Sequence, residues 1–246
     1  MPDAAALAAI AAVFLLAGTV KGVVGFGLPT VALALLAVAF GVPQAMALML
    51  APAFVSNIWQ SVAGGGAVQV LRRIWPFLLA AGLFIFLGAL ALTRVDLRWL
   101  SALLGAVLIV YAAVSLAGLH LRLTARQARW AGPLIGAVNG VLTGMTGSYV
   151  VPGVLYLQGI GLPRDQLIQA MGMLFLTSTL ALGLALGGND LLNAELGLLS
   201  AAALAPALIG MALGQRLRRR LPEPLFRKVF FAALLLLGAY IIARAL

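Results

Sequence analysis

The sequence predicts an all-α, polytopic transmembrane helical bundle with inverted-topology repeats, each a broken helical hairpin plus three transmembrane helices. Composition, long apolar runs and a repeated order of elements point to this fold. Of the residues, 64% are hydrophobic and only 9% are charged, whereas a soluble domain is about half apolar and a quarter charged. Such a chain cannot cover itself with a water-facing surface. The apolar runs are long and do not alternate, which favours spanning helices over barrel strands, with about 8 to 10 membrane segments in all.

Basic residues outnumber acidic residues by 16 to 6, which gives a formal net charge of +10. They stand in short clusters between apolar runs, as in the cytoplasmic loops of membrane proteins. We therefore expect a lipid bilayer around the chain and no nucleic acid as a partner. Cysteine is absent, which excludes disulfides and thiolate chemistry. The first residues lack the basic region of a signal peptide, so we expect the first apolar run to be retained.

A spanning helix needs about 20 apolar residues. Six runs satisfy this length, at Gln44–Val62, Ile74–Thr93, Trp99–Leu119, Pro163–Leu186, Ala194–Gly214 and Phe226–Arg244.

Two other apolar stretches, Ala4–Phe40 and Ala131–Gln158, are interrupted by glycine-rich segments at residues 21–29 and 143–148. Glycine lacks a Cβ and proline lacks an N–H donor, so we predict a helix break at each segment. Each stretch then forms a helical hairpin with a shorter second arm. The arm Leu28–Phe40 would be about 20 Å long, less than the roughly 30 Å hydrocarbon core. This favours re-entrant hairpins, with two tilted crossings as the alternative.

Basic clusters set the predicted topology, because Lys and Arg mark cytoplasmic segments. The clusters are Arg72 and Arg73; Arg122, Arg126 and Arg129 with His120; and Arg216, Arg218, Arg219, Arg220, Arg227 and Lys228. All three lie on one side only if the stretch Ala131–Gln158 returns to its starting side, which supports the hairpin. The prediction is a multi-pass protein of the cell inner (plasma) membrane with both termini on the outer side. Arg244 is then an exception near the outer interface.

The two halves, residues 1–120 and 121–246, repeat the same order of elements. Residues 17–22 resemble residues 135–140, and the Gly-Val-Pro-Gln sequence at 41–44 resembles the Gly-Leu-Pro-Arg sequence at 161–164. Each half has an odd number of full crossings, so the halves are predicted to be inverted. Inverted repeats are typical of secondary transporters, whose sites form where broken helices meet near the midplane. A duplicated scaffold without transport is the alternative.

Polar residues inside apolar segments are costly, and those that occur need a reason. Lys21 stands at the end of an apolar arm, where it either faces an anion in a central cavity or snorkels to the interface. Glycine-rich breaks expose backbone N–H groups that suit anions, although small residues also serve helix packing. The candidate substrate-binding residues are Lys21, Gly25, Gly27, Asn57, Gln60, Asn139, Thr143, Thr146, Ser148, Thr177 and Ser178. In the aligned repeats, Asn139 matches Lys21.

Enzyme chemistry has no visible basis in the sequence. The six acidic residues fall in predicted loops or helix ends, and the one histidine, His120, falls in a loop. No metal-ligand cluster, HExxH, GxSxG or phosphate-binding loop is present. We therefore expect no enzyme activity, no catalytic residue, no cofactor and no metal.

The glycine-rich segment at residues 21–29, with the Gly-Val-Pro-Gln-Ala sequence at 41–45 and residues 56–60, resembles the TauE/SafE family of sulfite and organosulfonate exporters. Residues 139–147 and 161–163 resemble the same family in the second half. The resemblance implies export of a small anion, such as sulfite or a C2–C3 sulfonate like sulfoacetate. A membrane potential that is negative inside would favour this export. A passive anion channel and a non-transporting scaffold are the rival interpretations. The sequence leaves the oligomeric state open, with a homodimer as one option.

Overall fold

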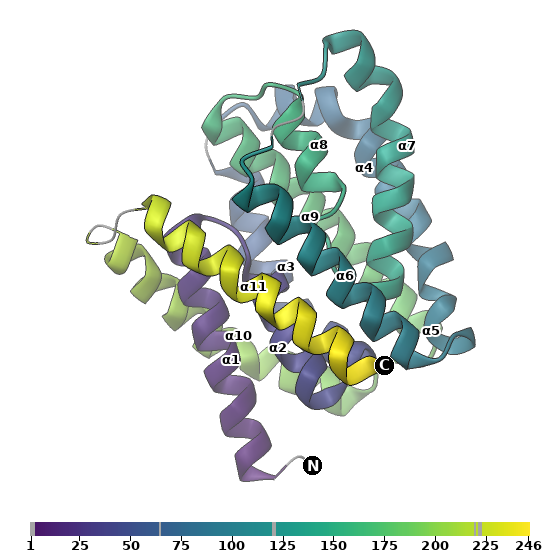
Figure 1. Ribbon diagram of the computed structural model, residues 1–246, viewed down its shortest axis with the longest axis vertical. Coiled ribbons are helices and arrows are strands. Elements are labelled where there is room, and N and C mark those ends of the chain that lie inside the picture. The colour runs from purple at the N-terminus through teal and green to yellow at the C-terminus, as the bar shows by residue number, and fades with distance from the viewer. Residues whose placement is uncertain (1–2, 64, 120–121, 219, 221–222) are drawn as a thin grey trace.

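The computed structural model describes residues 3–63, 65–119, 122–218, 220 and 223–246, and within these ranges every regular element is a helix (Figure 1). His120 and the predicted boundary between the two halves, after residue 120, lie outside the described residues. In chain order the helices are α1 (Ala4–Val24), α2 (Leu28–Phe40), α3 (Val42–Val62), α4 (Ala67–Ala89), α5 (Ala91–Arg94), α6 (Leu97–Leu116), α7 (Ala125–Thr146), α8 (Gly153–Gly159), α9 (Arg164–Gly188), α10 (Ala194–Arg218) and α11 (Glu223–Ala245).

The predicted all-helical membrane fold is confirmed. Seven stretches in the described part of the chain are long and apolar enough to cross a bilayer. Six of them match the predicted crossings, at α3, α4 with α5, α6, α9, α10 and α11, and the seventh is α1. The chain is therefore a multi-pass membrane protein.

Tryptophans mark two ends of this bundle. Trp75 and Trp130 are 54% and 78% exposed and closely follow the arginines of α4 and α7. Trp59 is 71% exposed and lies in the last turn of α3, which leads to the start of α4. Trp99 is 61% exposed and lies in the first turn of α6, after the opposite end of α4. Tryptophan is enriched at membrane–water interfaces, so these positions fit the edges of an apolar belt.

Both predicted hairpins are interrupted helices, and their second arms are short. α1 ends where Gly25, at φ +90°, donates its N–H to the Lys21 carbonyl oxygen at 2.8 Å. α7 ends in the same way at Gly147, at φ +75°, which donates to the Thr143 carbonyl oxygen at 2.7 Å. A side chain other than hydrogen is unfavourable at such φ values, so glycine fixes both ends. The second arms, α2 and α8, have 13 and 7 residues.

The helix breaks start later than expected. Residues 21–24 belong to α1, and residues 143–146 belong to α7, so only residues 25–27 and the segment after Thr146 are unwound. Gly22 and Gly144 lie within these helices, and each packs against the backbone of a neighbouring helix, where a Cβ would not fit. The sequence criterion treated every glycine in these segments as a break and did not separate packing glycines from capping glycines.

The basic clusters were expected in loops, and among the described residues this holds for Arg122 and Arg220 but is wrong for the others. Arg72 and Arg73 lie in the second turn of α4, and Arg126 and Arg129 lie in the first turns of α7. Arg216 and Arg218 end α10, while Arg227 and Lys228 lie in α11. Helices continue past the apolar belt because long basic side chains are readily hydrated at its edge.

The first arm of each hairpin packs along a helix from the other half of the chain. α1 runs parallel to α10, and α7 runs parallel to α4. Glycines make these contacts close: a Cβ added to Gly18 would lie 2.1 Å from the Ala207 carbonyl oxygen, and one added to Gly144 would lie 2.2 Å from the Ile85 carbonyl oxygen. α3 packs on α9, and α6 packs on α11. The broken hairpins are thus held by partners distant in sequence.

Candidate functional site

Lys21 lies in the last turn of α1 and is 4% exposed. Its Nζ donates to Asn57 Oδ1 at 2.5 Å and to Ser56 Oγ at 3.0 Å, and both acceptors lie on α3. Within the described ranges no carboxylate lies within ion-pair distance of this ammonium group. A buried cation with only neutral acceptors is costly unless an anion joins it. The lysine side chain lies inside the protein and does not snorkel to the surface.

Amide side chains extend this polar cluster onto α9. Gln60 is three residues beyond Asn57 on α3, and its Nε2 donates to the Ile168 carbonyl oxygen at 3.0 Å. Gln60 also lies against Gly172, where an added Cβ would be 2.9 Å from Gln60 Cγ. Gln169 is three residues before Gly172, on the same face of α9. We call Lys21, Ser56, Asn57, Gln60 and Gln169 the lysine cluster.

Several polar atoms of the lysine cluster have no hydrogen-bond partner. They are Asn57 Nδ2, Gln60 Oε1 and both amide atoms of Gln169, all buried. Buried polar atoms are nearly always satisfied in folded proteins, so unpaired donors mark a place where a ligand or water binds. Two of these atoms, Asn57 Nδ2 and Gln169 Nε2, are N–H donors, and Asn57 itself contacts the Lys21 ammonium group. Such donors together with a cation suit an oxyanion.

Gln169 was missed by the sequence reasoning. It is 0% exposed, although it lies only five residues after the start of α9. A polar residue so near a helix end is expected at the membrane–water interface. The signal that could have identified it is its position three residues before Gly172. The absence of a side chain at Gly172 lets Gln60 pack against that face of α9.

The first glycine break lies next to the lysine cluster. A Cβ added to Gly25 would meet no atom within 4 Å, so the backbone at this turn borders open space. Gly27, at φ +103°, precedes α2, whose first intrahelical bond runs from Val31 N to Gly27 O. The Leu28 and Thr30 amides come before that bond, and both residues are buried. A helix start of this kind favours negative charge.

The second glycine break is held mainly by its own side chains. Asn139 Oδ1 accepts from Gly153 N at 2.8 Å, and Thr143 Oγ1 donates to the Ser148 carbonyl oxygen at 3.0 Å. Thr146 Oγ1 accepts from Ser148 N at 3.2 Å. These bonds fix the turn between α7 and α8, and within this turn the buried Ser148 Oγ has no partner. We call Asn139, Thr143, Thr146 and Ser148 the hydroxyl cluster.

The hydroxyl cluster reaches α9 through Tyr149. Thr179 Oγ1 lies 3.4 Å from the Tyr149 hydroxyl and donates to the Phe175 carbonyl oxygen at 2.7 Å. Ser178, beside it, is buried with an unpaired Oγ. Thr177 instead packs on α4, where a Cβ added to Gly82 would lie 3.2 Å from its methyl group. Adjacent residues on a helix point about 100° apart, so Thr177 and Ser178 face different neighbours.

Seven of the candidate residues fall in two clusters at different depths, whereas one central site was expected. On α9, Gln169 and Thr179 are ten residues apart in sequence, which is about 15 Å along a helix. Gly22, next to Lys21, packs against Gly214 and Gln215, directly before the arginines that end α10. The lysine cluster therefore lies toward the basic end of the bundle, and the hydroxyl cluster lies toward the other end.

When both arms are counted back from their capping glycines, the residue that corresponds to Lys21 is Thr143. Gly25 and Gly147 each cap a helix through the residue four positions earlier, which is Lys21 in α1 and Thr143 in α7. The helix caps therefore pair Thr143 with Lys21, four residues or about one helical turn away from the sequence alignment, which pairs Asn139 with Lys21.

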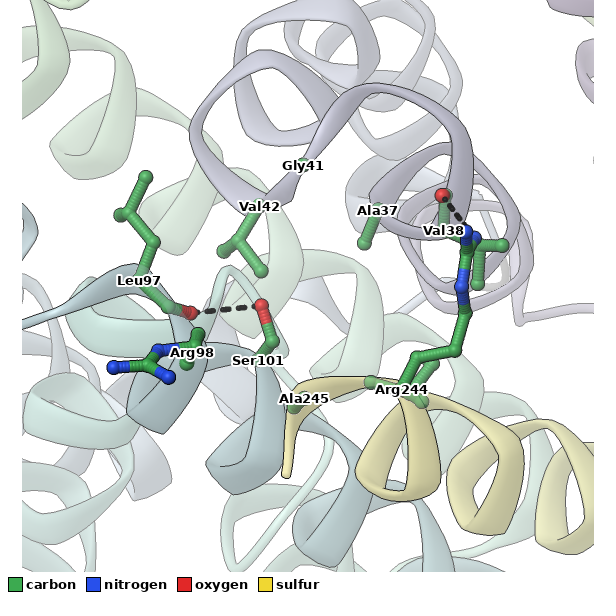
Figure 2. Close-up of a pocket in the computed structure, with 10 residues that line it drawn as sticks. Ala37, Val38, Gly41, Val42, Leu97, Arg98, Ser101, Arg244 and Ala245 are labelled. Carbon is green, nitrogen blue, oxygen red and sulfur yellow. Dashed lines mark hydrogen bonds between the residues drawn. The ribbon is translucent and has the colours of Figure 1, made fainter.

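A separate pocket of about 360 Å³ lies between α2, α6 and α11 and contains no candidate residue (Figure 2). Figure 2 shows Arg244 reaching the Val38 carbonyl oxygen, at 3.4 Å from Nη1, while Arg98 points away. Arg98 is paired with Asp96 at 2.9 Å, and these hydrogen bonds lower the pKa of the Asp96 carboxyl. This pocket lies at the end opposite the basic clusters, where Arg244 was expected.

Among known protein families, the one described as Sulfite exporter TauE/SafE matches residues 10–241, nearly the whole chain. No curated protein and no solved structure matches.

Proposed function

Because the chain belongs to the Sulfite exporter TauE/SafE family, a family of membrane anion exporters, we propose that it exports sulfite or a C2–C3 organosulfonate such as sulfoacetate. The lysine cluster is the proposed binding site. The observation that carries this proposal is Lys21, a buried ammonium group whose hydrogen bonds go to neutral acceptors on α3. A sulfonate or sulfite oxygen would supply a negative charge beside it and accept from the unpaired amide donors nearby.

We further propose that residues 1–120 and 121–246 are inverted repeats. The packing of α1 on α10 and of α7 on α4 supports this, because the first helix of each half meets a later helix of the other. On this view the transport path has a second binding site at the hydroxyl cluster. There the hydroxyls of Ser148 and of the neighbouring Ser178 contact the anion after it leaves Lys21. The protein would reside in the inner membrane, with the lysine cluster on the cytoplasmic side and both termini outside.

The driving force that we propose is the membrane potential. A potential negative inside favours outward movement of an anion by about 2.3 kcal/mol per charge per 100 mV. Proteoliposomes loaded with sulfite or sulfoacetate, with potassium and valinomycin setting the potential, test this directly. Efflux should rise with an inside-negative potential and fall when the sign is reversed, and an efflux indifferent to the potential would contradict the mechanism.

Two rivals are separated by simple measurements. A passive channel gives flux that does not saturate with substrate and is not stimulated by substrate on the opposite side. A scaffold gives no flux and no ligand effect on stability. A thermal-shift series of the purified protein with sulfite, sulfate, sulfoacetate, taurine and short carboxylates ranks the substrates, because a ligand of the folded state raises the melting temperature by mass action.

A further inference from the structure

Apart from the two clusters, the structure has a basic cleft of about 400 Å³ between the second and third turns of α4 and the N-terminal part of α7. Arg72 and Arg73 line it from α4, and Arg129 lines it from α7. Its floor includes Tyr156 of α8, and Trp75 stands at its edge, 54% exposed. Figure 1 shows α8 at the same end of the molecule as the start of α7.

The three guanidinium groups have no acidic partner in the part of the chain that the structure describes. Three like charges around one cleft repel each other unless an anion lies between them. Guanidinium groups form forked hydrogen bonds that match the oxygens of a phosphate group. The charge and the donor chemistry of the cleft thus suit an oxyanion such as a phosphate group.

The surroundings favour a lipid over a free ion. Trp75 is an interfacial type of residue, and the cleft opens beside it at the edge of the apolar belt. Basic pockets between helices on the cytoplasmic side commonly hold anionic lipid headgroups. Lys21 is not part of the cleft, because it packs beside α10 and α3, whereas the cleft lies between α4 and α7.

We propose that this cleft binds the phosphate group of an anionic phospholipid headgroup. The headgroup would also act on the second hairpin. Arg73 donates to the Ile160 carbonyl oxygen just after α8, and the Tyr156 hydroxyl donates to the Ala128 carbonyl oxygen at 3.0 Å. A bound lipid therefore neutralises the arginines at the point where α8 is fastened to α4 and α7.

The test uses purified full-length protein in detergent, titrated with short-chain phosphatidylglycerol, phosphatidylcholine or inorganic phosphate, with melting temperature as the readout. The cleft variant is Arg72→Gln with Arg129→Gln, which leaves the Arg73 contact intact. The control is Arg216→Gln with Arg218→Gln, which removes the same charge from the end of α10. Both variants must first show wild-type melting temperatures without lipid to within a few degrees. If the cleft variant alone is unstable, Arg72→Lys with Arg129→Lys replaces it, because these changes keep the charge and remove the fork.

We expect phosphatidylglycerol to stabilise the wild type and the control variant, with at least tenfold weaker apparent affinity in the cleft variant, and phosphatidylcholine to have no effect. Equal responses of wild type and cleft variant would overturn the proposal. Stabilisation by inorganic phosphate at the same concentration as phosphatidylglycerol would also overturn it, because the site would then serve a free anion. The readout is independent of transport, so failure here leaves the proposed export function standing.

Discussion

At the scale of single residues, the chain holds a cation inside a membrane protein without an acidic neighbour among the described residues. Lys21 could have been a structural tie between α1 and α3, since it joins Ser56 and Asn57. The unpaired amide atoms around it argue for an anion site instead. The two interpretations give opposite results on substitution, because a structural tie stabilises the ligand-free protein and an uncompensated charge destabilises it.

Replacement of Lys21 by methionine decides between them. Lys21→Met keeps a long unbranched side chain and removes the charge, so we expect an unchanged or higher melting temperature of the ligand-free protein. In the wild type, an anion at 100 times its dissociation constant should stabilise the folded protein by about 2.7 kcal/mol. In the Lys21→Met variant this stabilisation should vanish. Differential scanning fluorimetry with and without sulfite measures both quantities. A lower melting temperature together with an intact response to sulfite would show a merely structural lysine.

A built-in anion should replace the substrate. Asn57→Asp places a carboxylate where the Asn57 amide now meets Lys21 at 2.5 Å. We expect this pair to leave the protein stable and to lower sulfite export at least tenfold, which corresponds to about 1.4 kcal/mol, because the lysine is already neutralised. Proteoliposome efflux measures the rate. Asn57→Ala is the control, and it should keep a measurable response to the anion through Ser56; efflux from the Asn57→Asp variant at the wild-type rate would contradict the proposed role of the charge.

The sequence allowed Lys21, Asn57 and Gln60 to be singled out because charge and amides stand out in apolar helices. It did not reveal that Asn139, Thr143 and Thr146 fasten a turn, since those bonds depend on the path of residues 147–152. The sequence alone does not distinguish a hydroxyl group that binds a ligand from one that closes a turn.

At the scale of helices, the length of each apolar run predicts that a helix forms, but it does not predict which helices pack together. An apolar face is equally stable against lipid and against protein, so hydropathy does not identify the neighbouring helix. The glycines on α7 decide its partner, because they let its backbone approach the α4 backbone closely. The last of these glycines, Gly144, was interpreted from the sequence as part of a break, since a helix-packing role appears only when the second helix is in place.

Close packing of α7 on α4 gives a prediction for Gly144. A Cβ there would lie 2.2 Å from the Ile85 carbonyl oxygen, so Gly144→Ala must push the two helices apart. We expect a loss of about 1–3 kcal/mol in stability from overpacking, measured as a lower melting temperature. Gly187→Ala is the matched control in α9, because an added Cβ there meets no atom within 4 Å. That change should be neutral or stabilise by about 0.5–1 kcal/mol, and equal effects at both positions would refute the packing argument.

At the scale of the whole molecule, the order of elements predicted two similar halves, which stays a prediction. In the structure α1 packs on α10 and α7 packs on α4, so the first arm of each hairpin is supported by a helix distant in sequence. These long-range contacts position the two breaks, and a similarity between short sequence segments cannot indicate them. The lysine cluster and the hydroxyl cluster lie at different depths, which gives the proposed path a direction.

That direction rests on which end of the bundle faces the cytoplasm, and the absence of native cysteine allows a clean test. Gln69, at the start of α4, and Thr93, in α5, are both exposed and lie near opposite ends of the same span. With Arg72 and Arg73 inside, a membrane-impermeant maleimide should label Thr93→Cys in intact spheroplasts and Gln69→Cys only after lysis. The cysteine-free parent provides the blank. Labelling of Gln69→Cys without lysis would place the lysine cluster on the outer side, and the same Lys21 site would then have to act in uptake.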